Sequence, residues 1–150
     1  MIFQSPRPVP DIPVANIVRY IFDQAKQTVF GYNPDTPVII DARSKEQISF
    51  TEVERLTYRL ASGLQNRLGI TKGAYVGVYA NNDIYALPIF YSTALIGGVL
   101  VPTFPQVPAD VLAYRMQVTP PKCIFTTEEL LPIVREAMAI SGHNIPESHI

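Results

Sequence analysis

The sequence contains a single cysteine, Cys123, among its 150 residues. One thiol can form neither a disulfide within the chain nor a multi-cysteine zinc site, and it is compatible with a reducing compartment. Charged residues are also scarce, at 17% of the chain, and the formal net charge is −1. This balance gives no electrostatic case for binding nucleic acid or an anionic membrane surface. The low charge content also leads us to expect that something covers much of the chain.

A long uncharged run raises the question of a membrane segment, because no charged residue occurs from Ile84 to Ala109. A membrane-spanning helix needs about 20 apolar residues. Pro88, the pair Gly97-Gly98 and Pro102 divide this run into shorter pieces, so we expect no transmembrane segment. The N-terminal sequence "MIFQSPRPVPDIP" has no uninterrupted apolar core and does not resemble a secretory signal.

The order of the predicted elements defines the fold class. We expect a proline-rich arm at residues 1–13 and an α/β subdomain at residues 14–150. Periodicity predicts helices at 14–25, 51–68, 85–96, 108–119 and 130–140, and strands at 38–40, 48–50, 75–80, 99–101 and 122–127. The strand at 75–80 is apolar on both faces, which is typical of a sheet covered on both sides. The alternation predicts a wound, mostly parallel sheet with helices on both faces and a small N-terminal hairpin.

Caps and breakers set the expected element boundaries. Thr51 and Glu54 have the spacing of a capping box, in which a hydroxyl and a carboxylate each satisfy a free backbone N–H. The apolar stripe of that helix comprises Val53, Leu56, Leu60, Ala61, Leu64 and Leu68, and Gly69 is expected to end it. Asp11 and Asn16 are alternative caps for the first helix.

The segment from residue 92 to residue 112 joins a helix to a strand and then to another helix. Gly97-Gly98 lies where the helix must turn back into the strand, and glycine permits positive φ and close backbone approach. Pro102 is expected to stop the strand, and Pro105 and Pro108 to stiffen the following link. The last residues, "GHNIPESHI", indicate a helix end followed by the beginning of a strand.

Two stretches carry a resemblance to a known family. "ISFTEVERLTYRLASGLQNRLGITKGAYVGVYANN" resembles the first core motif of the adenylate-forming enzymes, with Phe50 in place of the usual tyrosine. "TALIGGVLVPTFPQVPADVLAYRM" resembles their second core motif, and its continuation is closest to the coumarate–CoA-ligase-like branch. The resemblance extends from about Asp11 to Thr127. The residues that correspond to the family's structural motifs are Phe50, Thr51, Glu54, Gly97, Gly98 and Pro102.

The resemblance implies a larger enzyme that uses ATP and magnesium to convert a carboxylic acid to an acyl-adenylate, then passes the acyl group to coenzyme A. Phosphate chemistry requires a Gly/Ser/Thr-rich loop with a lysine. No such run occurs, and Gly142 is the only glycine after Gly98. The family's adenine-binding, magnesium-binding and catalytic-lysine motifs lie later in its sequence. We therefore assign no catalytic, cofactor-binding or metal-binding residue to this chain.

The hypothesis from the sequence is the N-terminal part of a longer acid–CoA ligase, inactive without the remainder of that ligase and intracellular, either cytoplasmic or peroxisomal. A stand-alone binding or regulatory module derived from such a ligase is one alternative. A small nucleotide-binding α/β domain unrelated to ligases is another. Because one sheet edge would be left unpaired, we expect the isolated chain to self-associate.

Several single residues have side chains that could take part in catalysis or ligand binding, but we favour a structural role for each. Cys123 lies in an apolar strand and is expected to be a buried, unreactive thiol. His143 and His149 have no ligand partner at metal-binding spacing and are expected to be solvated. Asn81-Asn82-Asp83 follows a strand, where α/β proteins bind ligands, but a turn and helix cap is favoured. Gly77 lies inside a strand rather than after it, so Gly73 to Gly77 is not a dinucleotide-binding loop.

Four aromatic residues have two possible roles. They could line an acyl pocket, but packing in the core is the favoured interpretation. They are Tyr79, Tyr85, Phe90 and Tyr91.

Overall fold

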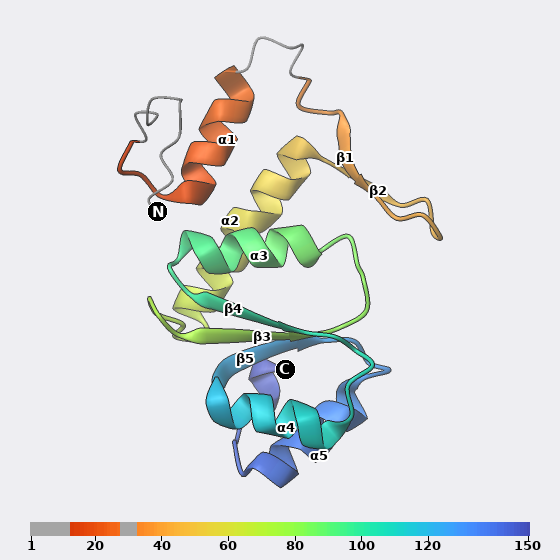
Figure 1. The fold of residues 1–150 in the computed structure, drawn as a ribbon. Helices are drawn as coiled ribbons and strands as arrows, with labels where there is room; N and C mark the ends of the chain where they lie inside the picture. The colour runs from red at the N-terminus through yellow and green to blue at the C-terminus, as the bar shows by residue number, and fades with distance from the viewer. Residues whose placement is uncertain (1–12, 28–32) are drawn as a thin grey trace, which may run out of the picture.

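The computed structural model of the chain describes residues 13–27 and 33–150. In chain order its elements are α1 (Ile17–Gln27), β1 (Pro37–Ile40), β2 (Gln47–Ser49), α2 (Phe50–Asn66), β3 (Tyr75–Tyr79), α3 (Ala86–Leu95), β4 (Val99–Thr103), α4 (Ala109–Val118), β5 (Pro121–Thr126), α5 (Leu131–Ser141) and the 3-10 helix η1 (Glu147–His149). β1 and β2 form an antiparallel hairpin, and the other strands form a parallel sheet in the order β4-β3-β5 (Figure 1). The predicted wound α/β fold with a small hairpin is confirmed. Apart from Pro13, the predicted arm and the candidate cap Asp11 lie outside the described residues.

Helices cover both faces of the parallel sheet, with α2 and α3 on one side and α4 and α5 on the other (Figure 1). Successive side chains of a strand point to opposite faces. In β5, Cys123 accordingly packs in the apolar cluster beneath α2, and Ile124 packs in the cluster beneath α4 and α5. Val76 and Tyr79 of β3 are buried in the same two clusters. Cover on both faces explains why β3 is an unbroken apolar run in the sequence.

A third apolar cluster joins α1 to the hairpin and to α3. Phe22 is buried within it, and its ring meets those of Phe50 and Tyr91 edge to face, with centroids 5.6 and 5.5 Å apart. Such aromatic pairs contribute about 0.5–1.5 kcal/mol beyond the burial of their area. These contacts fix α1 against the rest of the fold.

The N-terminus of α1 confirms one of the two predicted caps. The Asn16 Oδ1 atom accepts a hydrogen bond from the backbone N–H of Val18 at 3.1 Å. Asn16 also donates from its side-chain amide to the carbonyl oxygen of Leu95, at 3.0 Å, which ties the cap to the end of α3. Val14 was predicted to lie in this helix, but it precedes the cap and is fully exposed.

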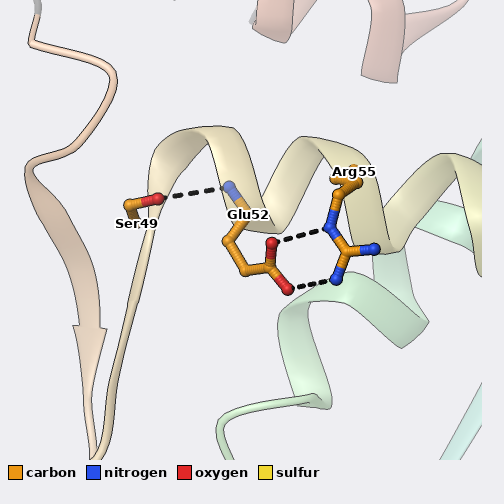
Figure 2. A network of polar contacts seen from close by, with 3 residues as sticks. All are labelled: Ser49, Glu52 and Arg55. Carbon is orange, nitrogen blue, oxygen red and sulfur yellow. Dashed lines mark hydrogen bonds and ion pairs between the residues drawn. The ribbon is translucent and has the colours of Figure 1, made fainter.

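The N-terminus of α2 differs from the predicted capping box (Figure 2). The cap is Ser49, whose Oγ accepts from the backbone N–H of Glu52 at 3.2 Å. The Glu52 carboxylate binds Arg55, with Nε 2.7 Å from Oε2, and this hydrogen bond lowers the pKa of Glu52. The capping box at Thr51 and Glu54 was therefore wrong, because Ser49 at the end of β2 already satisfies the free N–H. Both predicted residues lie inside the first turns of α2.

Two further boundaries are corrected. Pro102 does not stop β4, which continues to Thr103 and pairs Pro102 with Val78 of β3. Proline lacks an N–H donor but is tolerated on an edge strand, and β4 is at an edge of the described sheet. The predicted strand start near the end of the chain was also wrong, because Glu147–His149 form a 3-10 helix. Ile145 is buried in the cluster beneath α4 and α5, and this anchor directs the chain away from an extended path.

The two glycines that were predicted to end helices have different outcomes. Gly142 follows α5 directly and has a φ of 69°. Gly69 also has a positive φ, 63°, but α2 ends at Asn66, three residues before it. The prediction that Gly69 ends this helix was therefore wrong, because α2 already ends at Asn66 with Arg67 as its C-cap.

Candidate functional site

The residues of the first motif lie where α2 meets its neighbours. Phe50 is the first residue of α2 and packs its ring on Phe22 of α1. The Thr51 hydroxyl donates to the carbonyl oxygen of Pro34 at 3.0 Å, which ties α2 to the turn before β1. The Glu54 carboxylate forms an ion pair with Lys26 of α1 at 2.6 Å. Each of these side chains therefore joins α2 to another segment.

The residues of the second motif form the turn from α3 into β4. Gly97 has a φ of 73°, a conformation that L side chains rarely adopt. Its carbonyl oxygen accepts from the N–H of Gly73 at 2.8 Å, which holds the turn against the segment before β3. A Cβ atom on Gly98 would lie 3.0 Å from Cγ2 of Thr93 and 3.4 Å from the carbonyl oxygen of Ala74. Both glycines thus occupy positions where a side chain meets strain or crowding.

The carboxyl ends of the strands are the usual ligand edge of an open α/β sheet. After β3, the Asp83 Oδ1 atom accepts from the backbone N–H of Tyr85 at 2.7 Å, and Asn81 and Asn82 are exposed. This geometry confirms the predicted turn at Asp83, but the predicted helix cap was wrong, because Tyr85 is the N-cap of α3 and no side chain caps that helix. After β5, the Thr126 hydroxyl donates to the carbonyl oxygen of Tyr79 at 2.7 Å and closes the sheet at this end.

The four aromatic candidates do not gather around one cavity in the described structure. Tyr79 is fully buried, and its hydroxyl lies within hydrogen-bond distance of the carbonyl oxygens of Pro105 and Val107, at 2.9 and 2.8 Å. Tyr91 is half-buried against Phe22. Core packing is confirmed for these two.

The other two aromatic candidates behave differently. Tyr85 and Phe90 are 45% and 49% exposed, so the prediction of core packing was wrong for them. They lie at the start and on the outer side of α3, which no described element covers there.

Cys123 and the two histidines complete the list of chemically capable residues. Cys123 is buried as predicted, and burial raises the pKa of its thiol to about 11. The histidines are not solvated as predicted, because each is partly covered and docks on a backbone carbonyl at the start of β5. His143 Nε2 lies 2.8 Å from the Pro121 oxygen, and His149 Nδ1 lies 3.1 Å from the Lys122 oxygen.

The surface of the described residues also carries a groove that the sequence did not indicate. The groove over α2 has a volume of ≈ 850 Å³ and a mixed lining of apolar, small and basic side chains. Its lining includes Leu56, Arg59, Leu60, Gly63, Arg67, Leu68, Phe125 and Ser148. A second cavity of ≈ 300 Å³ follows the outer edge of β5 and shares Leu68, Phe125 and Ser148 with the first. The two cavities are therefore neighbours, one over α2 and the other at the edge of the sheet.

The described residues offer no membrane span and no metal site. Across residues 13–27 and 33–150, no helix has the length and apolar character needed to cross a bilayer. In the same ranges, no cluster of three or more His, Cys, Asp or Glu side chains is placed to hold a metal ion.

Comparison with known proteins places these features in a family. Residues 26–147 match the family described as AMP-binding enzyme. Phenylacetyl-CoA ligase epaB of Aspergillus niger is 32% identical over 151 aligned positions, which cover 100% of this chain and 26% of that protein. Acyl-CoA ligase azaF, also from Aspergillus niger, is 32% identical and is covered to 27% of its length. The chain thus spans about a quarter of the length of these curated relatives.

Solved structures show the same fold. The luciferase-like enzyme of the mealworm Zophobas morio superposes with a TM-score of 0.80 at 17% identity, over 97% of this chain and 33% of that enzyme. A benzoate CoA ligase from Burkholderia xenovorans superposes with a TM-score of 0.75 at 17% identity, over 86% of this chain and 25% of the ligase. The chain therefore belongs to the family of AMP-binding, adenylate-forming enzymes, of which it covers the N-terminal part.

Proposed function

We propose that the chain is the N-terminal part of an ATP-dependent carboxylic acid–CoA ligase. Such an enzyme converts an acid and ATP to an acyl-adenylate and pyrophosphate, and then transfers the acyl group to coenzyme A. The observation that carries the proposal is the similarity of the chain, over its whole length, to two acyl-CoA ligases. Within the ligase, residues 14–150 would form part of the N-terminal α/β subdomain.

The motif residues would serve this subdomain as structural joints. Thr51 and Glu54 connect α2 to the segments around it through the Pro34 oxygen and Lys26. Gly97 and Gly98 provide the tight turn between α3 and β4. This role agrees with their contacts, because each of these residues is engaged with or crowded by another segment of the fold.

ATP, magnesium and coenzyme A do not fit the residues of this chain. A nucleotide phosphate requires several backbone N–H groups from a glycine-rich loop, usually with a lysine. The sequence has no such loop, and the described residues hold no acidic cluster for a divalent cation. We therefore propose that the 150 residues alone are inactive, and that the remainder of the ligase binds ATP, magnesium, coenzyme A and the carboxylic acid. The proposed location of the ligase is intracellular, either cytoplasmic or peroxisomal.

The test is to express the longest reading frame that contains these 150 residues and to assay its product. The purified protein is incubated with ATP, magnesium, coenzyme A and a panel of aliphatic and aryl carboxylic acids. The proposal expects an acyl-CoA thioester and AMP with at least one acid. A frame without a downstream glycine-rich loop and lysine, or a folded product that forms no thioester with any acid, would instead favour a stand-alone module.

A further inference from the structure

The three strands of the parallel sheet continue in two directions from their carboxyl ends. The connection after β3 turns to the face that α2 and α3 cover, whereas the connections after β4 and β5 turn to the face that α4 and α5 cover (Figure 1). Because β3 lies between β4 and β5, the winding of the sheet changes direction at the end of β3. Open α/β sheets bind their ligands in the crevice at such a point. This topology places the crevice between the first turns of α4 and α5.

The side chain of Tyr79 lies at this point. Tyr79 is the last residue of β3 and belongs to the apolar cluster on the α4 and α5 face of the sheet. The same cluster contains Ala109, the first residue of α4, and Leu130, the N-cap residue of α5. The exposed fraction of Tyr79 is 0%, so solvent reaches no part of it. A buried tyrosine therefore stands where the topology would place a ligand.

Hydrogen bonds close the crevice from both neighbouring strands. The Tyr79 hydroxyl donates to the carbonyl oxygens of Pro105 and Val107 in the link after β4, at 2.9 and 2.8 Å. On the other side, the Thr126 hydroxyl at the end of β5 donates to the Tyr79 carbonyl oxygen at 2.7 Å. Tyr79 thereby ties together the carboxyl ends of all three strands, through residues that lie between β3 and α5.

The connections around the crevice lack the groups that hold a phosphate at such an edge. A nucleotide site there relies on glycines that bring backbone N–H groups close to the anion. Residues 80–85, 104–108 and 127–130 contain no glycine, lysine or arginine. Their charged residues are all acidic and oppose an anion; they are Asp83, Glu128 and Glu129. The sequence of the connections thus agrees with the packing of Tyr79.

We propose that Tyr79 occupies the ligand crevice of this sheet in place of a ligand, and thereby closes the crevice and fixes the link after β4. The crevice becomes a binding site only when the ring is removed, and the ligand that it then accepts is a small phenol. Such a molecule replaces both the buried ring and the hydroxyl that donates to the link. The closure depends on the fold alone, so it holds whether or not the proposed ligase function does.

Replacement of Tyr79 by alanine, with phenol added back, tests this proposal. Tyr79→Ala removes the atoms of a phenol, and buried apolar cavities bind small aromatic molecules. The variant is made in the product of the longest reading frame that contains the chain, and the readout is amide hydrogen exchange of residues 103–112. Exchange there should be faster in Tyr79→Ala by about tenfold or more. Millimolar phenol should restore the wild-type rate, and benzene, which lacks the hydroxyl, should restore less of it.

Matched controls separate the crevice from general effects of the variants and the ligands. Tyr79→Phe keeps the ring and should not respond to phenol, but loss of the donor should speed the exchange of residues 103–112 about 2- to 10-fold. Tyr91→Ala removes a ring that packs on Phe22, outside the crevice, so phenol should leave the exchange of residues 103–112 unchanged in this variant. The wild type should respond to neither ligand. Tyr79→Phe and the wild type test the proposal even if Tyr79→Ala does not fold.

Three results would overturn the proposal. The first is exchange of residues 103–112 that is the same in Tyr79→Phe and the wild type, because Tyr79 would then not fix the link. The second is protection of these residues by phenol in the wild type, which would show that the crevice is already open. The third is a folded Tyr79→Ala protein in which phenol restores no more protection than benzene does.

Discussion

The hydroxyl of Tyr79 lies 2.8 Å from the carbonyl oxygen of Val107, and both residues belong to segments that are far apart in the sequence. Tyr79 is the last residue of the central strand β3, whereas Val107 lies in the proline-rich link between β4 and α4. The carbonyl oxygen of Pro105 is also within reach, at 2.9 Å, and the single hydroxyl proton is shared between the two acceptors. One buried side chain thereby holds the link against the end of the sheet.

Replacement of Tyr79 by phenylalanine tests this anchor. The substitution keeps the ring but removes the donor to two carbonyl groups, so the free energy of unfolding should fall by about 0.5–1.5 kcal/mol. Urea unfolding followed by circular dichroism measures the loss. Tyr114→Phe is the control, because Tyr114 is exposed, and it should change stability by less than about 0.5 kcal/mol. Equal effects at the two positions would show that the Tyr79 hydrogen bond contributes nothing.

The turn between α3 and β4 provides a second test. In Gly98→Val, the new Cβ would lie 3.0 Å from Cγ2 and 3.3 Å from the carbonyl oxygen of Thr93. The crowding should lower the free energy of unfolding by about 1–3 kcal/mol or more. The urea midpoint checks this value. An unchanged midpoint would show that the turn relaxes freely and is not part of the packed core.

A substitution at Gly63 is expected to raise stability, in contrast to the substitution at Gly98. It lies inside α2, and a Cβ atom there would meet no heavy atom of the described residues within 4 Å. Gly63→Ala should therefore raise the free energy of unfolding by about 0.5–1 kcal/mol, because alanine favours the helix. A loss of stability, measured by the same urea titration, would contradict this expectation. It would indicate that the groove over α2 is filled in solution and leaves no room for the added methyl group.

The burial of Cys123 predicts how the free energy of unfolding depends on pH. Its pKa in the folded chain is about 11, above the value of about 8.5 for an unfolded thiol. Between these values the folded state keeps a proton that the unfolded state has lost. The free energy of unfolding should therefore fall as the pH rises, by at most about 1.4 kcal/mol per pH unit. The stabilising effect is complete below the unfolded pKa and is lost as the pH rises through the folded pKa.

The measurement compares wild type with Cys123→Ala in urea titrations from about pH 8 to about pH 11. The variant lacks this titration, so its stability should decline less steeply over the range. Cys123 should also react slowly with an alkylating reagent in native buffer and rapidly in urea. Parallel pH curves for the two proteins, together with rapid native alkylation, would contradict a buried thiol.

Local patterns predicted the elements well, because their signals lie close together in the sequence. The apolar run of β3 and the helical periodicity of α2 gave the correct types and order. Ser49 and Glu52 have the same spacing as Thr51 and Glu54, so two capping signals overlap in the sequence. The choice of Thr51 was wrong, because the correct choice depends on where β2 ends. Pro102 was misread as a strand end because the sequence does not reveal that β4 is an edge strand.

The candidate site was less predictable, because it depends on long-range geometry. Nothing near His143 in the sequence indicates that its ring docks on the Pro121 oxygen, 22 residues away. The partner of Glu54 is Lys26 of α1, at a distance of 28 residues in the chain. The groove between α2 and β5 exists only because these elements lie side by side without further cover, which is a property of the assembled fold.

Pyrophosphate–ATP exchange tests the account most directly. The 150-residue chain and the product of the longest reading frame that contains it are assayed side by side, with radiolabelled pyrophosphate, ATP, magnesium and a panel of carboxylic acids. The account predicts acid-dependent exchange by the longer product and none above the enzyme-free blank by the 150 residues. Exchange by the 150 residues alone, lost on substitution within the chain, would contradict it, as would a folded longer product that exchanges with no acid.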